Sequence, residues 1–323
     1  MWPFGQNKHI SEQDLGDLHG KVAIVTGGYS GIGYCTVQFL ARKGAKVQMS
    51  LHCTEIMISH ICCHQVYLAT RNEEGTKAAM EKLEKEGIND GSLHWLKIEL
   101  DDPHSAKNAA EKFAKREERL DILVNNAGSY LGHFILTENL LPLLIQTSKQ
   151  EGSDVRIINV SSRGHTMVSP ASFVGKDNFN KSYGTSWLKD LSTYGLSKLA
   201  NVLHTKHLQR RLNDQKVDII CMVIHPGIVF TPNVQQFLDN RSALFRPFFS
   251  ALLHIFFVPM RQGAMNSAYT AASPEVKSKA GAFEAAYVDP VGKIVNPSAS
   301  GNDERLANEL YDTTLEILGE LKI

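Results

Sequence analysis

The feature that most constrains the fold of this chain is a repeated alternation of apolar runs with longer helix-like segments. The apolar runs are rich in β-branched residues and show no alternation of polar and apolar positions. Strands of this kind belong in a parallel sheet that helices cover on both faces. The expected strands are 21–28, 66–70, 92–100, 120–128, 154–162 and 217–227, and the expected helices are 33–45, 72–87, 102–118, 132–152 and 194–212. The sequence therefore predicts an α/β fold with a doubly wound parallel sheet.

The length of 323 residues suits one such domain with additions. We expect an N-terminal extension over 1–19, the α/β domain over 20–295 and a peripheral C-terminal tail over 296–323. A substrate lid is expected over 232–265, since its stretch "PFFSALLHIFFVPM" is very apolar. That stretch has 14 residues, whereas a membrane-spanning helix needs about 20. A buried helix or a lid is the preferred interpretation, and peripheral membrane contact is the alternative.

Composition narrows the partners and the compartment. The formal net charge is zero, which argues against nucleic acid and against an anionic lipid surface. The five cysteines have no disulfide-framework spacing, which indicates a reducing compartment. No apolar segment near the N-terminus resembles a signal peptide. We therefore expect a cytoplasmic protein that acts on a small molecule.

A glycine-rich turn follows the first expected strand and begins the first expected helix. It reads Thr26-Gly-Gly-Tyr-Ser-Gly-Ile-Gly33. Glycines let the backbone approach a pyrophosphate, and the first N–H groups of the helix attract the negative charge. A tight turn without a ligand is the alternative, and the motif alone is weak evidence. Its position between a strand and a helix favours a Rossmann-type dinucleotide site.

Four further motifs lie at the carboxyl ends of the later strands or on the helix facing them. Asn125–Gly128 and the segment 225–231 each end a strand, and Ser162 is the second serine of a pair that ends another. Tyr194 and Lys198 are four residues apart on an expected helix, so they share one face. An ammonium beside a phenol favours the phenolate and suits the phenol to acid–base catalysis. Taken singly, these motifs have ordinary alternatives, such as a serine helix cap or a solvated helix face. Together they mark the sheet edge where open α/β sheets bind ligands.

Taken together, these motifs resemble the short-chain dehydrogenase/reductase family over residues 20–231. "RIINVSSRGH" and "YGLSKLANVLHTKHLQRRL" are similar to its retinol-dehydrogenase-like branch, which includes WW-domain oxidoreductases and many fungal reductases. The resemblance implies that Tyr194 is the catalytic acid–base, that Lys198 assists it and holds the nicotinamide ribose, and that Ser162 positions the carbonyl. It also implies a role in secondary metabolism. The cofactor-binding residues implied by the motifs are Gly27, Ser30, Ile32, Gly33, Asn126, Tyr194, Lys198, Pro226 and Thr231.

The end of the second strand bears on the choice of cofactor. NAD enzymes place an acidic residue there for the ribose 2′-hydroxyl. Here the strand ends Ala69-Thr-Arg71, with no acid, and a guanidinium can pair with a 2′-phosphate. A surface arginine is the alternative interpretation of Arg71. In the resemblance, Glu99 stands where the family usually has an aspartate near the adenine. We therefore expect NADP as the cofactor.

The segment Val47–Gln65 interrupts the second strand. Its removal joins "GAK" to "VYLATRNEEG", which reads as one continuous strand of the family. The segment is 19 residues long, so its coding length preserves the reading frame, and valine and glutamine codons can supply the GT and CAG edges of a retained intron. A genuine surface loop is the second explanation. A metal site is the third, but no spacing typical of zinc ligands supports it. Its candidate ligands are His52, Cys53, His60, Cys62, Cys63 and His64.

A second departure lies directly after Gly128. The family has on the order of twenty more residues between this strand and the next helix, beyond an ordinary short connection. The asparagine that completes the family's proton relay is absent, and Ser129 stands in its place. This loss favours an alternative function, that of a catalytically impaired dinucleotide-binding or interaction protein. The resemblance also implies a homodimer through the fourth and fifth helices, and the first of these is the shortened one.

Overall fold

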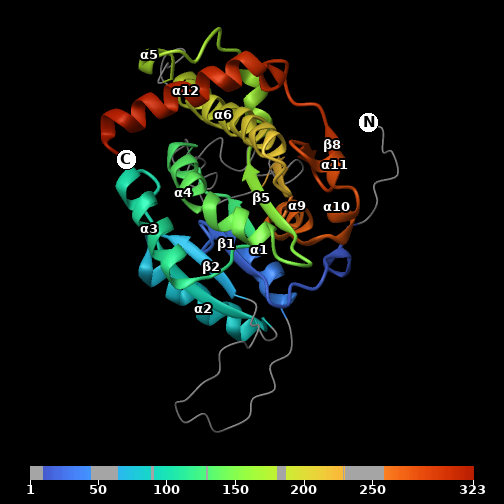
Figure 1. Ribbon diagram of the computed structural model, residues 1–323. Helices are drawn as coiled ribbons and strands as arrows, with labels where there is room; N and C mark the ends of the chain where they lie inside the picture. The colour runs from blue at the N-terminus through green and yellow to red at the C-terminus, as the bar shows by residue number, and fades with distance from the viewer. Residues whose placement is uncertain are drawn as a thin grey trace, which may run out of the picture.

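An eight-stranded sheet forms the centre of the computed structural model, which describes residues 10–44, 65–88, 91–128, 130–179, 187–227, 229 and 258–323 (Figure 1). The strand order is β3-β2-β1-β4-β5-β6-β7-β8, and every neighbouring pair is parallel except β7 with β8. The strands are β1 Val22–Thr26, β2 Gln65–Thr70, β3 Ser92–Lys97, β4 Ile122–Asn125, β5 Val155–Val160, β6 Ile219–Ile224, β7 Tyr287–Asp289 and β8 Lys293–Val295. This confirms the predicted doubly wound, Rossmann-type sheet.

Helices cover both faces of this sheet. One face carries α1, α2 and α9, and the other carries α3, α4 and α6, with α12 lying across α6 (Figure 1). The longer helices are α1 Gly31–Arg42, α2 Glu73–Glu86, α3 Pro103–Arg116, α4 Tyr130–Ser148, α6 Trp187–Asp214, α9 Met260–Ala272 and α12 Glu304–Leu321. The shorter ones are η1 Glu12–Asp14, η2 Arg163–Met167, α5 Lys176–Phe179, α10 Pro274–Ser278, α11 Ala280–Phe283 and η3 Ser300–Asn302.

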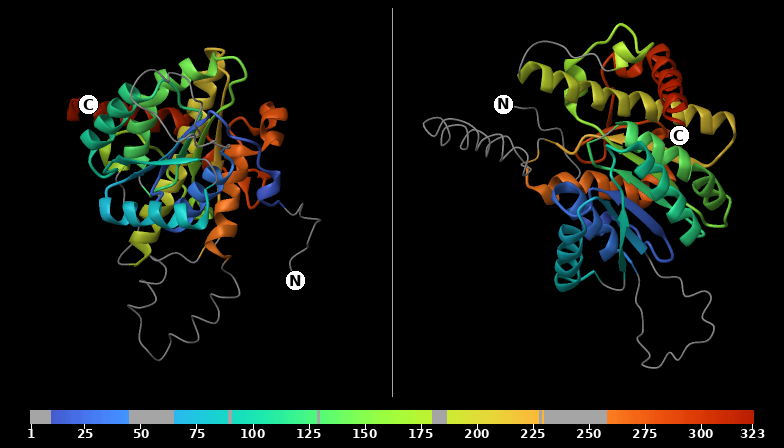
Figure 2. Two further views of the ribbon diagram at one scale, coloured as in Figure 1. Left: turned by 90° about the horizontal axis from the view of Figure 1, so that it is seen from below. Right: turned by 90° about the vertical axis from the view of Figure 1, so that its left-hand side faces the viewer.

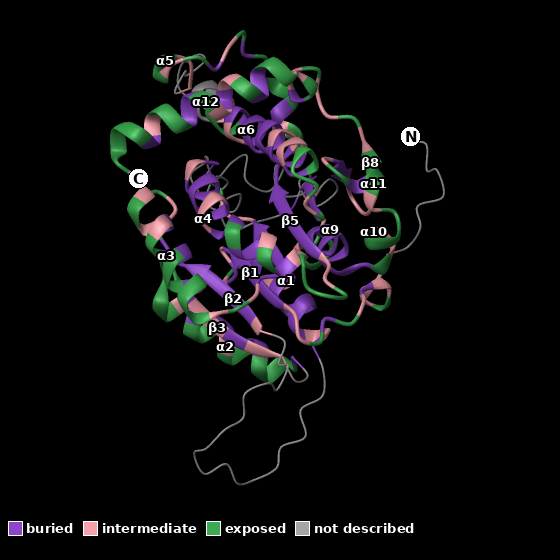
Figure 3. Cartoon of the chain, in the orientation of Figure 1, coloured by how far each residue is buried: buried purple, intermediate pink, exposed green. Residues whose placement is uncertain are grey.

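Two apolar clusters lie on opposite sides of the sheet, because the side chains of its central strands alternate between the two faces. In β1, for example, Ile24 belongs to the cluster with α3, α4, α6 and α12, whereas Val25 belongs to the cluster with α1, α2 and α9. The central strands β1, β2, β4, β5 and β6 are accordingly buried along almost their whole length (Figure 3). Because both faces are apolar, these strands read as continuous apolar runs in the sequence.

Both ends of the described chain contribute to the core, which corrects the expectation that they are peripheral. Leu15 and Leu18 are buried, and the N–H of Gly16 donates to the carbonyl of Ala272 at 2.8 Å. The N-terminal segment therefore lies beside the end of α9 (Figure 2). At the other end, α12 packs on α6 and buries Leu310. The apolar face of α12 covers part of α6 that the sheet does not reach.

The expected lid is only partly described. Its residues 260–265 begin α9, which packs against α1 and the sheet. Residues 232–257, with most of the apolar stretch, lie outside the described residues. No helix in the described ranges is both long and apolar enough to cross a bilayer.

The interrupting segment also lies almost wholly outside the described residues, including every candidate ligand of the metal interpretation. Its last residue, Gln65, belongs to β2 and lies in register with Val22 of β1 and Ser92 of β3. The strand therefore begins one residue earlier than the boundary at Val66 predicted.

Candidate active site

Two positions of the glycine-rich turn favour glycine, one for its backbone conformation and one for its close contacts. Gly27 has a φ of +67°, in the left-handed region, and its N–H donates to the carbonyl of Ala69 at 2.8 Å. A Cβ on Gly33 would lie 2.3 Å from the carbonyl oxygen of Gly27 and 2.8 Å from Nδ2 of Asn126. Ser30 is the N-cap of α1, and its side chain makes no capping bond. The turn thus presents the free N–H groups of α1 as an anion cradle that fits a pyrophosphate.

Thr26 joins this turn to the end of β4. Its Oγ1 accepts hydrogen bonds from the N–H groups of Asn126 and Ala127, at 2.8 and 3.0 Å. Nδ2 of Asn126 donates to the Thr26 carbonyl at 2.9 Å. Asn126 therefore serves the architecture of the turn as well as lining the cleft.

The short connection between β4 and α4 leads into close packing at the start of α4. Nε2 of His133 lies 2.9 Å from Oγ1 of Thr26, and burial lowers the pKa of His133 to about 3. A neutral His133 with its proton on Nδ1 can accept a hydrogen bond from the Thr26 hydroxyl at Nε2. A Cβ on Gly132 would lie 2.3 Å from the Leu100 carbonyl oxygen, so α4 begins against the end of β3. These contacts hold the start of α4 close to β1 and to the turn after β3.

The predicted catalytic serine and tyrosine belong to two elements that contact each other, η2 and α6. Ser162 is the N-cap of η2, and its Oγ accepts the N–H of Gly164 at 3.1 Å. A Cβ on Gly164 would lie 3.1 Å from Cε1 of Tyr194, and a Cβ on Gly195 would lie 2.8 Å from the Gly164 carbonyl oxygen. The two glycines therefore let the helix approach the serine turn. The capping bond uses the serine oxygen as an acceptor and leaves its O–H free to donate.

Lys198 lies on the same face of α6 as Tyr194, as the spacing of four predicts. Its Nζ is 5.6 Å from the centre of the Tyr194 ring and donates to the Val160 carbonyl at 3.1 Å. Lys198 is only 4% exposed, whereas Tyr194 is 46% exposed. Burial lowers the pKa of Lys198 to about 8. The buried Lys198 ammonium, bonded to the last residue of β5, thus lies close to the ring of the exposed Tyr194.

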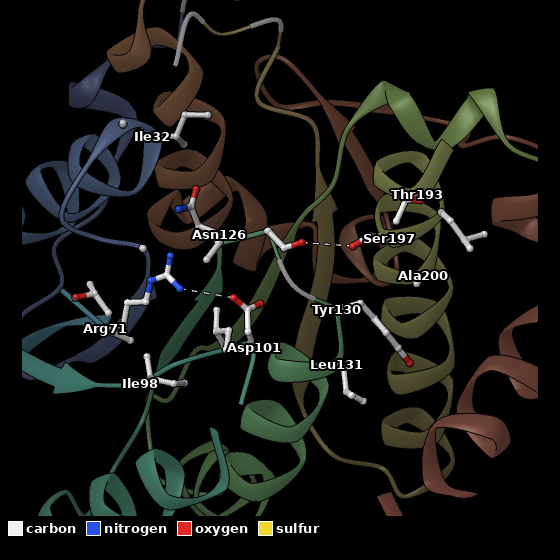
Figure 4. A pocket seen from close by; sticks show the side chains of 18 of the residues that line it. Ile32, Arg71, Ile98, Asp101, Asn126, Tyr130, Leu131, Thr193, Ser197 and Ala200 are labelled. Carbon is white, nitrogen blue, oxygen red and sulfur yellow. Dashed lines mark hydrogen bonds and ion pairs between the residues drawn. The ribbon is translucent and has the colours of Figure 1, made fainter. Parts of the chain in front are cut away.

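A cavity of about 1180 Å³ opens between the glycine-rich turn, the ends of β2 to β4 and α6 (Figure 4). Its volume exceeds that of a typical small-ligand pocket, so it has room for a dinucleotide. Ile98 and Arg71 lie on one side of it, and Thr193 and Ser197 of α6 lie on the other (Figure 4). The predicted cofactor residues that line it are Gly27, Ser30, Ile32, Arg71 and Asn126.

The other predicted residues lie outside the described lining of this cavity. Ser162, Tyr194 and Lys198 are absent from it, although Thr193 and Ser197 are their chain neighbours on α6. Pro226 is buried directly after β6, and Thr231 lies outside the described residues. The structure therefore brings most of the predicted residues together in two groups, one around the cavity and one at the contact between η2 and α6, whereas Gly33 and Pro226 belong to neither group.

Arg71 is exposed and has two acidic neighbours. Its Nη1 lies 3.7 Å from Glu99 and 3.8 Å from Asp101, and all three side chains are more than half exposed. Exposed pairs of this kind contribute little to stability, so a stronger anion can compete for the guanidinium. Sequence reasoning considered Glu99 but missed Asp101, which lines the cavity.

Sequence reasoning also missed the glycines at positions 164 and 195. Each is an ordinary glycine in the sequence, and its role appears only where η2 meets α6. The motif "RGH" that contains Gly164 was visible, but no local pattern indicated a contact with a helix about thirty residues later.

Comparisons with known proteins agree with this geometry. The family model for short chain dehydrogenases matches residues 63–131, beginning just before β2. A short-chain dehydrogenase/reductase of Armillaria gallica is 35% identical over 327 residues, covering 95% of each chain. Retinol dehydrogenase 14 of Homo sapiens is 30% identical over 331 residues, covering 96% of this chain and 89% of that protein.

The solved structures support the fold. The NADP active-site complex of RhlG from Pseudomonas aeruginosa has a TM-score of 0.59 at 21% identity, with 85% of this chain and 96% of that chain covered. The two relatives above and the family model show that the chain belongs to the short-chain dehydrogenase/reductase family, in its retinol-dehydrogenase-like branch, and is an oxidoreductase that acts on CH–OH groups with a nicotinamide dinucleotide.

Proposed function

We propose that this protein interconverts a carbonyl and an alcohol on a small apolar substrate with NADP(H), in secondary metabolism. The observation that carries the proposal is the arrangement of Ser162, Tyr194 and Lys198 at the contact between η2 and α6. Its fungal relatives and its resemblance to fungal reductases support the metabolic assignment.

The chemistry of the chain's own residues follows from their positions. The Ser162 O–H donates to the substrate oxygen, which places that oxygen beside the phenol of Tyr194. Tyr194 gives a proton to this oxygen in reduction and takes one in oxidation. The Lys198 ammonium stabilises negative charge on the phenol oxygen during this exchange. A bound nicotinamide supplies or accepts the hydride.

Arg71 supports NADP over NAD. The 2′-phosphate would be a better partner for the guanidinium than the exposed carboxylates of Glu99 and Asp101, because it offers several charged oxygens at once. The carboxylates of Glu99 and Asp101 repel the phosphate. The Arg71 guanidinium must therefore move away from them when the cofactor binds. The α1 cradle and the apolar Ile98 suit the pyrophosphate and the adenine, which either cofactor carries.

A catalytically impaired dinucleotide-binding protein is the second candidate function. It is favoured by the position of Ser162, Tyr194 and Lys198 outside the described lining of the cavity, and by the start of α4 only two residues after Gly128. In this case the cleft binds cofactor but does not bring it to Tyr194.

One experiment separates the two candidates. The full chain is tested for NADPH binding by fluorescence titration and for NADPH oxidation with a panel of apolar aldehydes and ketones. The first candidate predicts turnover, and it predicts that Tyr194→Phe abolishes turnover while NADPH affinity stays within about twofold, since only the titrating oxygen is lost. Binding without turnover across the panel supports the second candidate. A Tyr194→Phe variant that reduces a substrate at the parental rate excludes Tyr194 as the acid.

The finer assignments of location and assembly are also part of this proposal. A cytoplasmic location agrees with the absence of a disulfide framework in the sequence. A homodimer through α4 and α6 would involve the helix that starts only two residues after Gly128. Sedimentation of the purified chain tests the assembly.

A further inference from the structure

His165 is a buried histidine whose two ring nitrogens both have backbone partners. It is 1% exposed and lies in η2, three residues after Ser162. Its Nδ1 is 2.7 Å from the carbonyl oxygen of Ser162, and its Nε2 is 3.1 Å from the backbone nitrogen of Ser298. The ring also packs against Tyr287 of β7, with 4.9 Å between ring centres. His165 therefore joins the serine turn to the segment after β8, 133 residues away in the sequence.

These partners determine the tautomer of His165. A backbone N–H can only donate, so Nε2 must carry the lone pair that accepts from Ser298. A carbonyl oxygen can only accept, so Nδ1 must carry the proton that goes to Ser162. Burial also lowers the pKa of His165, and the bond to Ser162 partly offsets this. The imidazole is therefore neutral at neutral pH, with its proton on Nδ1.

The carbonyl that His165 holds belongs to the residue whose hydroxyl we assign to the substrate. The Ser162 carbonyl also accepts the N–H of His165 itself at 3.1 Å, while the Ser162 Oγ accepts the N–H of Gly164. Three hydrogen bonds thus fix both ends of this serine. Loss of the whole imidazole removes one hydrogen bond from the Ser162 carbonyl and also removes the bond from Ser298.

We propose that His165 is a positioning residue that orients Ser162 for catalysis and couples it to the segment after β8. The proposal rests on the proposed function, since Ser162 is its target. A displacement of about 1 Å in a positioned group can reduce a rate by about 100-fold. Its signature is a loss in kcat without a loss in cofactor affinity, because His165 does not line the cavity.

Three substitutions separate the two hydrogen bonds. Asn can place an N–H near the position of Nδ1 and keep the bond to Ser162, but it is too short to reach Ser298. Gln can reach the position of Nε2 and keep the bond from Ser298, but not the bond to Ser162. His165→Ala keeps neither bond. Thr166→Ala is the matched control, because it removes a side-chain bond to the carbonyl of Arg163 in the same turn.

The expected kinetic order follows from the bond to Ser162. We expect His165→Ala and His165→Gln to lower kcat by about 10- to 100-fold, and His165→Asn to stay within about fivefold of the parent. NADPH affinity stays within about twofold in all three variants and in the Thr166→Ala control, which also keeps its kcat. If His165 served only to link the serine turn to the segment of Ser298, the order would be reversed, with His165→Gln retaining more activity than His165→Asn. That order would overturn the proposal.

Two readouts do not depend on turnover. Nitrogen-15 NMR of the full chain should show His165 as the Nδ1–H tautomer, and the opposite tautomer would overturn the proposal. Hydrogen exchange of the Ser298 amide should be at least tenfold faster in His165→Ala and His165→Asn than in the parent, and near parental in His165→Gln. An active parent whose kcat is unchanged in His165→Ala refutes only the role of His165. A parent that binds NADPH but turns over no substrate refutes the proposed function and, with it, the catalytic part of this inference.

Discussion

Replacement of Gly195 by alanine tests the contact that brings Tyr194 to the serine turn. The new Cβ would lie 2.8 Å from the Gly164 carbonyl oxygen and 3.1 Å from Cγ1 of Val168. The first neighbour is backbone and cannot rotate away. The helix and the turn must therefore separate by roughly half an ångström to reach ordinary contact at about 3.4 Å.

The effects on stability oppose one another. Overpacking at a close contact costs about 1–3 kcal/mol, whereas alanine gains about 1 kcal/mol over glycine inside a helix. The net loss in the free energy of unfolding is therefore about 0–2 kcal/mol. For a chain of 323 residues, each kcal/mol lowers Tm by about 1–2 °C. The variant should remain folded at assay temperature.

The effect on catalysis should be much larger, because the displaced helix carries the phenol. A shift of this size between Tyr194 and Ser162 should lower kcat by about 10- to 100-fold, with NADPH affinity within about twofold. The assay is NADPH oxidation with the best substrate of the panel, together with Tm and cofactor titration. Gly319→Ala in α12 is the matched control, because its Cβ would have no neighbour within 4 Å. A folded Gly195→Ala variant with kcat within twofold of the parent refutes the reasoning, and so does an equal loss in the control.

Three further predictions address the cofactor, the buried lysine and the interrupting segment. Arg71→Ala should weaken NADPH binding by about 1.5–3 kcal/mol and leave NADH binding unchanged; equal affinity of the parent for the two cofactors contradicts this. Lys198 has a folded pKa of about 8 against an ordinary 10.5, so between these values the unfolded chain holds a proton that the folded chain lacks. The free energy of unfolding of the cofactor-free protein should therefore rise with pH across this window, by at most about 3 kcal/mol. Urea unfolding at pH 7.5 and at pH 9.5 measures this rise, and the Lys198→Met variant should not show it. Deletion of residues 47–65 should raise the free energy of unfolding by about 1–3 kcal/mol, because the entropy cost of closing this long loop is removed. Lys46 then takes the place of Gln65 at the start of β2. A deletion that unfolds the chain or releases stoichiometric zinc contradicts this prediction.

The sequence alone determined the order of β1 to β6 with the helices between them, and the edge of the sheet where the candidate site is expected, but β7, β8, α9 and α12 were not predicted. Both follow from local patterns: continuous apolar runs require burial on two faces, and a glycine-rich turn between a strand and a helix favours the left-handed Gly27 and the close approach at Gly33. The pairing of Tyr194 with Lys198 also follows from helix periodicity. These properties depend on neighbours within a few residues, so they can be predicted without a tertiary structure.

Only the tertiary structure decided which distant residues meet. It showed that α12 covers α6, that Arg71 has carboxylates from the end of β3 beside it, and that Gly164 and Gly195 let a helix approach the serine turn. It also showed His165 bonded to Ser298 across 133 residues of sequence. Such contacts depend on how complete elements pack against one another. A histidine or a glycine in a local pattern carries no information about the partner that packing will bring to it, and for this reason the positions of these side chains could not be predicted from the sequence.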